Sequence, residues 1–195
     1  MKNFTYRQCQ PDEKEAVTDI FFANREALCL PDRPAAAKVT ELLFAKGYVI
    51  GGYHDDNMVG VLGYFLGEPQ HDFANKNILY LYVGAILPEY QLTRIFFHVL
   101  LFIVEMYQGT AVTHIRLQAE STNPYTNKLY GRFAQPLARE KSPRGVPVIT
   151  YGAAIEDVMA FTSRFKRPPR RTQTPQQYYF EHRIRPCVPP HNWQL

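Results

Sequence analysis

The sequence predicts a mixed α/β (α+β) fold built around one segment, residues 78–133. Residues 78–87 are apolar and aromatic without alternation, which is typical of a strand covered on both faces. Residues 92–108 carry apolar side chains around nearly the whole circumference, which predicts a buried helix that ends at Gly109. Residues 114–119 alternate as a second strand. Because a right-handed crossover makes two such strands parallel, we expect a parallel pair with the helix packed across it.

The elements that precede this segment are predicted from turn residues and apolar spacing. Residues 4–8 alternate weakly and indicate a first strand. Residues 11–28 recur at helical spacing, with carboxylates in the first turn that complement the helix dipole. The run CLPDRP, residues 29–34, breaks this helix, and a second helix over residues 35–46 ends at Gly47.

Two antiparallel hairpins are predicted from apolar runs that flank turn residues. Residues 48–54 and 58–66 are separated by Asp-Asp-Asn, and a polar loop follows at 67–76. Residues 133–139 and 146–154 flank the turn KSPRG and form the last hairpin. The sheet therefore combines antiparallel hairpins with the parallel pair.

Two further helices complete the predicted domain. Asn123 followed by Pro124 is typical of a helix start, because asparagine caps the first turn and proline fits its first position. Residues 155–165 form a short helix with an acidic start and a basic end. From residue 166 the composition becomes basic and rich in proline, so we expect a domain at 1–165 and a tail at 166–195.

Composition and charge indicate a protein of the reducing cytosol with a self-sufficient core. The chain is 46% hydrophobic and 14% aromatic, which is enough to form a core without disulfide bonds or a structural metal ion. Residues from Arg164 onward carry seven basic side chains and one acid, a net +6, which leaves −2 for the rest of the +4 chain. Cys9, Cys29 and Cys187 have no metal-ligand spacing and indicate structural thiols.

No targeting or membrane segment is predicted. The first fifteen residues lack the apolar core of a signal peptide. The longest apolar run, Ile95–Val104, is interrupted by His98 and is about half of the roughly 20 residues that a bilayer requires. We therefore expect a soluble, cytoplasmic protein.

The order of elements over residues 4–154 resembles the GNAT superfamily of N-acetyltransferases. The best local match is Asn123 followed by the run LYGRF, residues 129–133, which is similar to the family's Asn, Leu-Tyr and Gly-Phe with one inserted arginine. The resemblance implies a mostly antiparallel sheet with a parallel central strand pair, flanked by helices. It also implies acetyl-CoA as the acyl donor and an amine as the acceptor.

The family holds the pyrophosphate of CoA in a loop with the pattern Q/R-x-x-G-x-G/A, and this sequence departs from that pattern. Gln91 matches, but Arg94 and Phe96 occupy the two small positions. Two interpretations stay open: a helix start that still attracts phosphate without glycine, or an inherited fold with a closed cofactor site. The cofactor-binding residues that the resemblance implies lie at this junction and beside the next helix: Leu87, Gln91, Leu92, Thr93, Arg94, Ile95, Asn123 and Tyr130.

The resemblance also implies the catalytic groups. Tyr130 has the position of the tyrosine that protonates the departing thiolate, and a phenol with a pKa near about 10 can do so. The alternative is that Tyr130 only packs the helix end. Residues 78–87 lack the family's strand glutamate, so Glu120 is the candidate base, or else a solvated turn carboxylate. Backbone groups near residues 82–85 are expected to polarise the thioester carbonyl.

No metal cluster, nucleophile triad or dinucleotide-binding glycine pattern is visible, which excludes those site classes. Two function hypotheses remain. The first is a CoA-dependent acyltransferase that acts on an amine. The second is an inactive GNAT-like module that contacts a protein partner, or its own domain, through residues 166–195. Six positive charges on that tail are too generic to indicate a nucleic acid.

Overall fold

The computed structural model describes residues 4–91, 93–142 and 145–165, and every structural statement below concerns these residues. The chain divides into two units, Met1–Phe165 and Lys166–Leu195, and the description falls within the first. The predicted tail, Leu92 and Cys187 lie outside the described residues.

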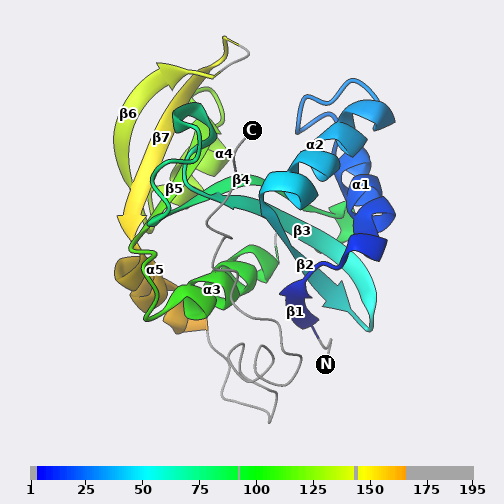
Figure 1. Cartoon of the computed structure of the whole chain (residues 1–195), viewed down its shortest axis with the longest axis horizontal. Helices are drawn as coiled ribbons and strands as arrows, with labels where there is room; N and C mark the ends of the chain where they lie inside the picture. Colours follow the sequence, from blue (N-terminus) through cyan, green and yellow to red (C-terminus); the bar gives the residue numbers. More distant parts are fainter. Residues whose placement is uncertain (1–3, 92, 143–144, 166–195) are drawn as a thin grey trace. The chain divides into compact units, whose positions relative to one another are not determined.

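The described strands form one seven-stranded sheet in the order β1-β2-β3-β4-β5-β7-β6 (Figure 1). Only β4 and β5 pair in parallel, and all other neighbours in this sheet are antiparallel. The predicted mixed, mostly antiparallel sheet with a central parallel pair is therefore confirmed. The strands are β1 (Phe4–Gln8), β2 (Tyr48–His54), β3 (Asn57–Leu66), β4 (Ile78–Ile86), β5 (His114–Glu120), β6 (Gln135–Lys141) and β7 (Pro147–Ala154).

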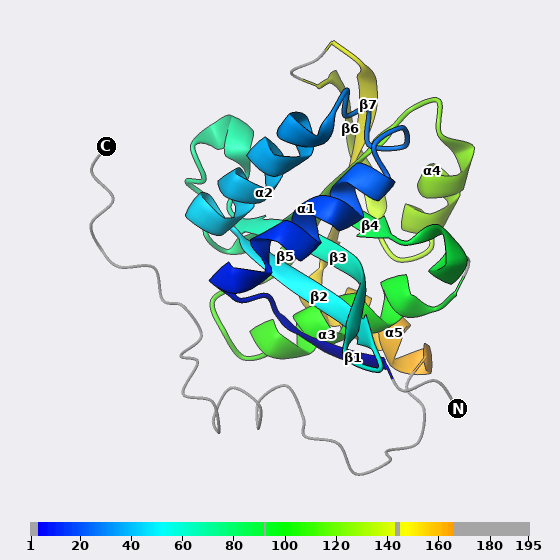
Figure 2. The same cartoon turned by 90° about the vertical axis from the view of Figure 1, so that its right-hand side faces the viewer.

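Helices cover both faces of this sheet (Figures 1 and 2). One buried cluster joins α1 and α2 to β2, β3 and β4, and a second joins α3 and α5 to the other face. The helices are α1 (Lys14–Ala23), α2 (Arg33–Lys46), α3 (Ile95–Tyr107), α4 (Pro124–Tyr130) and α5 (Ile155–Thr162). Short 3-10 turns are η1 (Pro11–Glu13), η2 (Pro69–His71), η3 (Pro88–Tyr90) and η4 (Ser163–Phe165).

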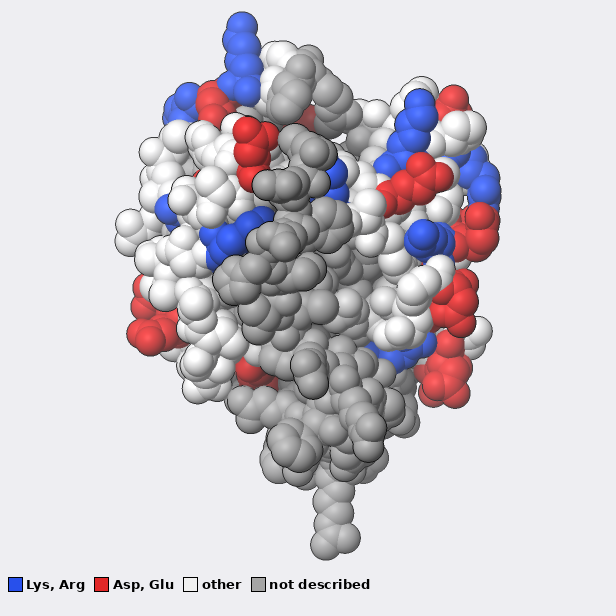
Figure 3. All heavy atoms as spheres, in the orientation of Figure 1, with Lys and Arg blue, Asp and Glu red and all other residues white. Residues whose placement is uncertain are grey.

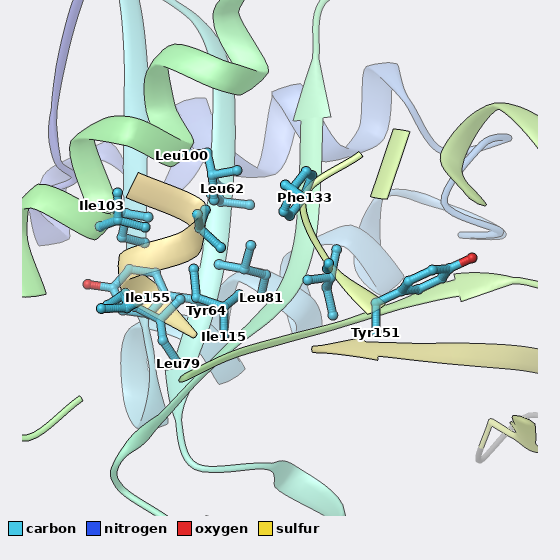
Figure 4. Packing of buried hydrophobic residues seen from close by; sticks show 14 of the residues in the cluster. Leu62, Tyr64, Leu79, Leu81, Leu100, Ile103, Ile115, Phe133, Tyr151 and Ile155 are labelled. Atoms are coloured by element: carbon cyan, nitrogen blue, oxygen red, sulfur yellow. The ribbon is translucent and has the colours of Figure 1, made fainter. Parts of the chain in front are cut away.

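The central strand β4 is covered on both faces, as its continuous apolar run predicts. Leu79 is fully buried in the cluster on the α3 side, with Leu100 and Ile115 (Figure 4). Its neighbour Tyr80 is buried in the cluster on the α1 and α2 side. The two clusters therefore use alternate residues of the same strand.

Element boundaries differ from the prediction at the end of α1. The helix ends at Ala23 and not at Leu28, because the Asn24 side-chain amide donates to the Ile20 carbonyl at 2.9 Å and turns follow. The first predicted hairpin is confirmed. Asp55 and Asp56 both have positive φ, 48° and 65°, as a tight two-residue turn requires.

Hydrogen bonds to the Glu13 carboxylate connect η1 to β1 and β2. The Arg7 guanidinium donates to both Glu13 oxygens, at 2.6 and 2.8 Å, and the Tyr53 hydroxyl donates at 2.7 Å. The Gln10 N–H adds a bond of 2.8 Å. Partial burial alone would raise the pKa of Glu13, but these hydrogen bonds and the Arg7 charge together lower that pKa to about 2.

The lowered pKa of Glu13 predicts a loss of stability in acid. In the unfolded chain this carboxyl takes a proton near its ordinary pKa of 4.5, while the folded form resists until about 2. The stabilisation is therefore complete above about pH 5 and is lost as the pH falls to about 2, a change of at most about 3 kcal/mol because solvent screens this partly exposed ion pair. Urea unfolding at several pH values should show this loss in the wild type and not in Glu13→Gln. Glu41→Gln, an exposed acid on α2, should behave like the wild type.

Candidate functional site

The parallel strands β4 and β5 separate part of the way along their length. Their ladder runs from the Ile78–His114 pair to the Leu81–Leu117 pair and then stops, although β4 continues to Ile86. Beyond that point β4 is paired only with β3, and β5 only with β7. The facing edges of the two strands therefore carry backbone groups without a strand partner. Such groups need another partner, such as water or a ligand.

A β-bulge in β4 coincides with this separation. Gly63 of β3 pairs with Val83, whereas the next residue, Tyr64, pairs with Leu81, so Tyr82 is left over. The bulge changes which residues face each side: Leu81 packs on the α3 side, and Val83 packs with the α1 and α2 cluster. The sequence predicted that backbone groups here polarise a carbonyl, and the irregular part of the strand lies at this place.

The junction between β4 and α3 is built by local hydrogen bonds. The Thr93 hydroxyl donates to the Tyr90 carbonyl at 2.7 Å and accepts the Ile95 N–H at 3.4 Å. The Gln91 side-chain amide donates to the Ile86 carbonyl at 3.3 Å. Leu87 accepts the N–H of Tyr90 at 2.9 Å and so closes η3. The helix therefore starts at Ile95, three residues later than predicted, because η3 and this hydroxyl occupy the intervening turn.

The start of α3 offers hydrogen-bond donors and positive charge. Among the described residues, no acceptor is recorded for the Phe97 N–H, and His98 donates to the Arg94 carbonyl at 3.0 Å. The Arg94 side chain is exposed, and its guanidinium carbon lies 5.8 Å from the centre of the Phe165 ring. No carboxylate of the described residues pairs with Arg94. These groups fit a pyrophosphate, since a helix start with free N–H groups binds anions.

Phe96, at the second position where the family has a small residue, lies in an aromatic cluster. Its ring centre is 6.3 Å from that of Tyr130 and 6.3 Å from that of Phe133. The side chain is half-buried and packs against the core on the α3 side. The bulky residue is therefore accommodated by packing beside Tyr130.

Tyr130 ends α4 with its ring packed and its hydroxyl free. The ring contacts Phe96, Phe133 and Tyr151, the last at 5.8 Å between centres. No described residue hydrogen-bonds to the hydroxyl. Burial raises the pKa of Tyr130 to about 12. Packing of the helix end and donation of a proton are compatible roles for Tyr130, because the ring makes the packing contacts and the hydroxyl stays protonated.

The turn from β5 into α4 depends on two asparagines. Asn123 is the helix cap, and its side-chain oxygen accepts the Thr126 N–H at 3.0 Å. Asn127 was not predicted: its amide donates to the Glu120 carbonyl at 2.8 Å, and its oxygen accepts the Tyr151 hydroxyl at 2.9 Å. Asn127 therefore positions the ring that packs on Tyr130. An asparagine inside a helix gives no sequence signal for this role.

Glu120, the predicted base, is the last residue of β5 and is half-buried. Leu117 and Ala119 face the α3 core, so strand alternation places Glu120 on the opposite face. Tyr130 packs with the α3 core. The predicted acid and the predicted base therefore come from opposite faces of the sheet.

The described residues contain no group of three or more His, Cys, Asp or Glu side chains arranged to hold a metal ion. None of the described helices has the length and apolar character needed to cross a membrane. Figure 3 shows acidic and basic side chains interspersed on one face of the described surface.

Comparison of the sequence with protein-family models and with curated proteins gives no match. Solved structures do match. A protein assigned to the GNAT family from Desulfovibrio desulfuricans is 17% identical, with a TM-score of 0.63 over 78% of this chain and 99% of that chain. The ribosomal-protein-S18-alanine N-acetyltransferase of Escherichia coli is 11% identical, with a TM-score of 0.60 over 78% and 94%. The PaiA N-acetyltransferase of Thermoplasma acidophilum, solved with coenzyme A, is 11% identical, with a TM-score of 0.56 over 76% and 98%. At these identities the likeness concerns the architecture, and the chain has the fold of the GNAT family of N-acetyltransferases.

Proposed function

We propose that this protein transfers an acetyl or related acyl group from CoA to an amine. The observation that supports this most strongly is the separation of β4 from β5 at the Leu81–Leu117 pair, together with the bulge at Tyr82. These two irregularities leave unpaired backbone groups beside each other. In a regular sheet, neighbouring strands would pair these backbone groups.

In this proposal the β4–α3 junction holds the pyrophosphate. The start of α3 would face the phosphates, with Arg94 supplying the positive charge, and the Ile95 N–H could turn to a phosphate only by leaving the Thr93 hydroxyl. Thr93 and Gln91 hold the turn in shape through their bonds to Tyr90 and Ile86. Leu87, Leu92 and Asn123 complete the proposed cofactor contacts, with Leu92 outside the described residues.

The chemistry requires a polarised carbonyl and a proton donor. CoA supplies the acyl group as an activated thioester when bound. The backbone of residues 82–85 would polarise the carbonyl, and the Tyr130 hydroxyl would protonate the departing thiolate. Glu120 is the proposed base on the acceptor side. Attack by the amine would be direct, since no activated nucleophile was predicted.

The alternative of an inactive module is not favoured. It depends on a cofactor site closed by Arg94 or Phe96, but Arg94 is exposed and Phe96 packs beside Tyr130. It also depends on residues 166–195, which lie outside the described residues, so a protein partner or docking onto the chain's own domain stays a prediction. A cytoplasmic location is likewise part of the proposal and rests on the cysteine usage alone.

Acetyl-CoA is expected to raise the melting temperature. At a concentration of about 100 times Kd, a ligand specific for the native state adds about 2.7 kcal/mol, or roughly 5–10 °C for a domain of this size. Arg94→Ala should weaken binding about tenfold, because it removes one charge-assisted contact. Arg139→Ala, an exposed arginine on β6, should bind as the wild type does. If millimolar acetyl-CoA produces no thermal shift and no calorimetric heat, the proposal is ruled out.

S-acetylpantetheine separates the two halves of the ligand. It carries the thioester but lacks the pyrophosphate, so it should bind equally to wild type and Arg94→Ala. If Arg94→Ala weakens both ligands alike, the arginine does not act on the phosphates.

A further inference from the structure

The tip of the β2–β3 hairpin contacts the turn that leads into α3. His54 is the last residue of β2, and its Nδ1 lies 2.8 Å from the hydroxyl oxygen of Tyr90, the last residue of η3. The two rings meet edge to face, with their centres 5.5 Å apart. Because 36 positions separate the two residues in the sequence, this contact links two segments that lie far apart along the chain.

The His54 ring is held by its neighbours on both sides. Phe4 of β1 stacks on it with ring centres 5.0 Å apart, and Asp55 Oδ2 lies 3.3 Å from Nε2. Because a carboxylate only accepts hydrogen bonds, we assign the proton of the neutral ring to Nε2, which leaves Nδ1 to accept from the Tyr90 hydroxyl. The His54 side chain is only 16% exposed, so the ring has little room to turn away from Tyr90.

Tyr90 connects this contact to the start of α3. Its backbone carbonyl accepts the Thr93 hydroxyl at 2.7 Å, and that hydroxyl accepts the Ile95 N–H at 3.4 Å. Its own N–H donates to the Leu87 carbonyl at 2.9 Å and closes η3. A displacement of Tyr90 would therefore move the turn and the first residue of the helix.

The two ends of η3 are held in different ways. The Leu87 N–H donates to the Val59 carbonyl of β3 at 2.9 Å, so a backbone bond to the sheet fixes the residue before the turn. Tyr90 lies at the other end, on the side of Arg94 and α3. There the bond to His54 is a side-chain contact with the hairpin, and it can be removed without breaking a backbone hydrogen bond.

We propose that His54 is a positioning residue for the CoA pyrophosphate. Through Tyr90 it holds the β4–α3 junction in the arrangement that receives the phosphates, and it does not touch the ligand. This role rests on the proposed function. A helix start binds an anion best when its donors are already aligned, since ordering a loop on binding costs free energy and lowers affinity. The bond between His54 and Tyr90 should therefore contribute to acetyl-CoA affinity and not to the chemical step.

The test compares the dissociation constants of acetyl-CoA and S-acetylpantetheine, measured by calorimetry. His54→Ala and Tyr90→Phe should each weaken acetyl-CoA binding about fivefold, as expected for one lost hydrogen bond. Binding of S-acetylpantetheine, which lacks the pyrophosphate, should not change. In steady-state assays the KM for acetyl-CoA should rise while kcat stays the same. His71→Ala, which changes an exposed histidine of η2, should behave like the wild type in every measurement.

Further variants separate positioning from packing. His54→Asn puts an amide near the place of Nδ1 and should restore affinity, whereas His54→Gln puts its amide near the place of Nε2 and should not. The double variant that combines His54→Ala with Tyr90→Phe should bind no more weakly than the weaker single variant, because both changes remove the same bond. Fully additive losses would show that the two residues act independently and would contradict the proposal.

The outcomes distinguish this inference from the proposed function. If the wild type does not bind acetyl-CoA, the proposed function fails and this role fails with it. If the wild type binds and Tyr90→Phe and His54→Ala bind equally well, only the positioning role is overturned. Equal weakening of acetyl-CoA and S-acetylpantetheine would also overturn it, because His54 would then only support the fold. Tyr90→Phe removes a single hydroxyl, so it decides the question even if His54→Ala does not fold.

Discussion

Tyr130→Phe is expected to lower kcat by about 10²–10⁴-fold, with little change in the KM for acetyl-CoA. No described residue bonds to the hydroxyl, so its removal breaks no hydrogen bond within the described part of the chain, and the ring stays packed on Phe96 and Tyr151. Burial raises the pKa of Tyr130 to about 12, so the phenol keeps its proton throughout the range of an assay. Release of the CoA thiol, with n-butylamine as the acceptor, measures the rate.

A matched tyrosine on the same helix provides the control. Tyr125 lies on α4 and is 62% exposed, so Tyr125→Phe also removes one hydroxyl but should leave kcat unchanged. The wild-type rate should show no loss from ionisation of Tyr130 between about pH 8 and 10, because a raised pKa delays that loss. A Tyr130→Phe enzyme with a wild-type rate would reduce Tyr130 to a packing residue.

The arrangement of β4, α3 and β5 could be predicted because it depends on local patterns. The continuous apolar run of residues 78–87 and the apolar circumference of the following helix require burial on every side. A crossover between parallel strands provides that burial, because the connecting helix packs across the pair. Asp55 and Asp56 likewise predicted their hairpin, since aspartate tolerates the positive φ that the turn needs.

The bulge at Tyr82 could not be predicted from the sequence. The run around it contains no glycine or proline at the bulged position, and the extra residue is defined only by the register with β3. The same limit applies to the bonds that link Glu140 to Gln118 and Thr150. These residues come from three different strands, and only the folded sheet brings them together.

The end of α1 was predicted wrongly for a different reason. Residues 24–28 keep the apolar spacing of the helix, so periodicity alone extends it. Asn24 instead donates its side chain to Ile20, a local hydrogen bond that competes with the next helical one. Sequence patterns predict which residues are buried better than they predict where a helix stops.

Leu79→Ala is expected to lower the free energy of unfolding by about 2–5 kcal/mol. Leu79 is fully buried on β4 and belongs to the cluster that contains Leu100 and Ile115 (Figure 4). Truncation removes buried methyl groups and leaves a cavity that a central strand, held by neighbours on both edges, cannot close. Urea unfolding followed by circular dichroism gives the change, which is large beside a typical total of about 5–15 kcal/mol.

Leu137→Ala is the matched control, because Leu137 is 52% exposed on the edge strand β6. We expect its cost to stay within about 0.5 kcal/mol, as for other surface substitutions. The m-value should be unchanged in both variants, since neither alters the surface exposed on unfolding. Equal costs at the two positions would mean that β4 is not the packed centre of the sheet, and the proposed cofactor site would then lose the strand that positions it.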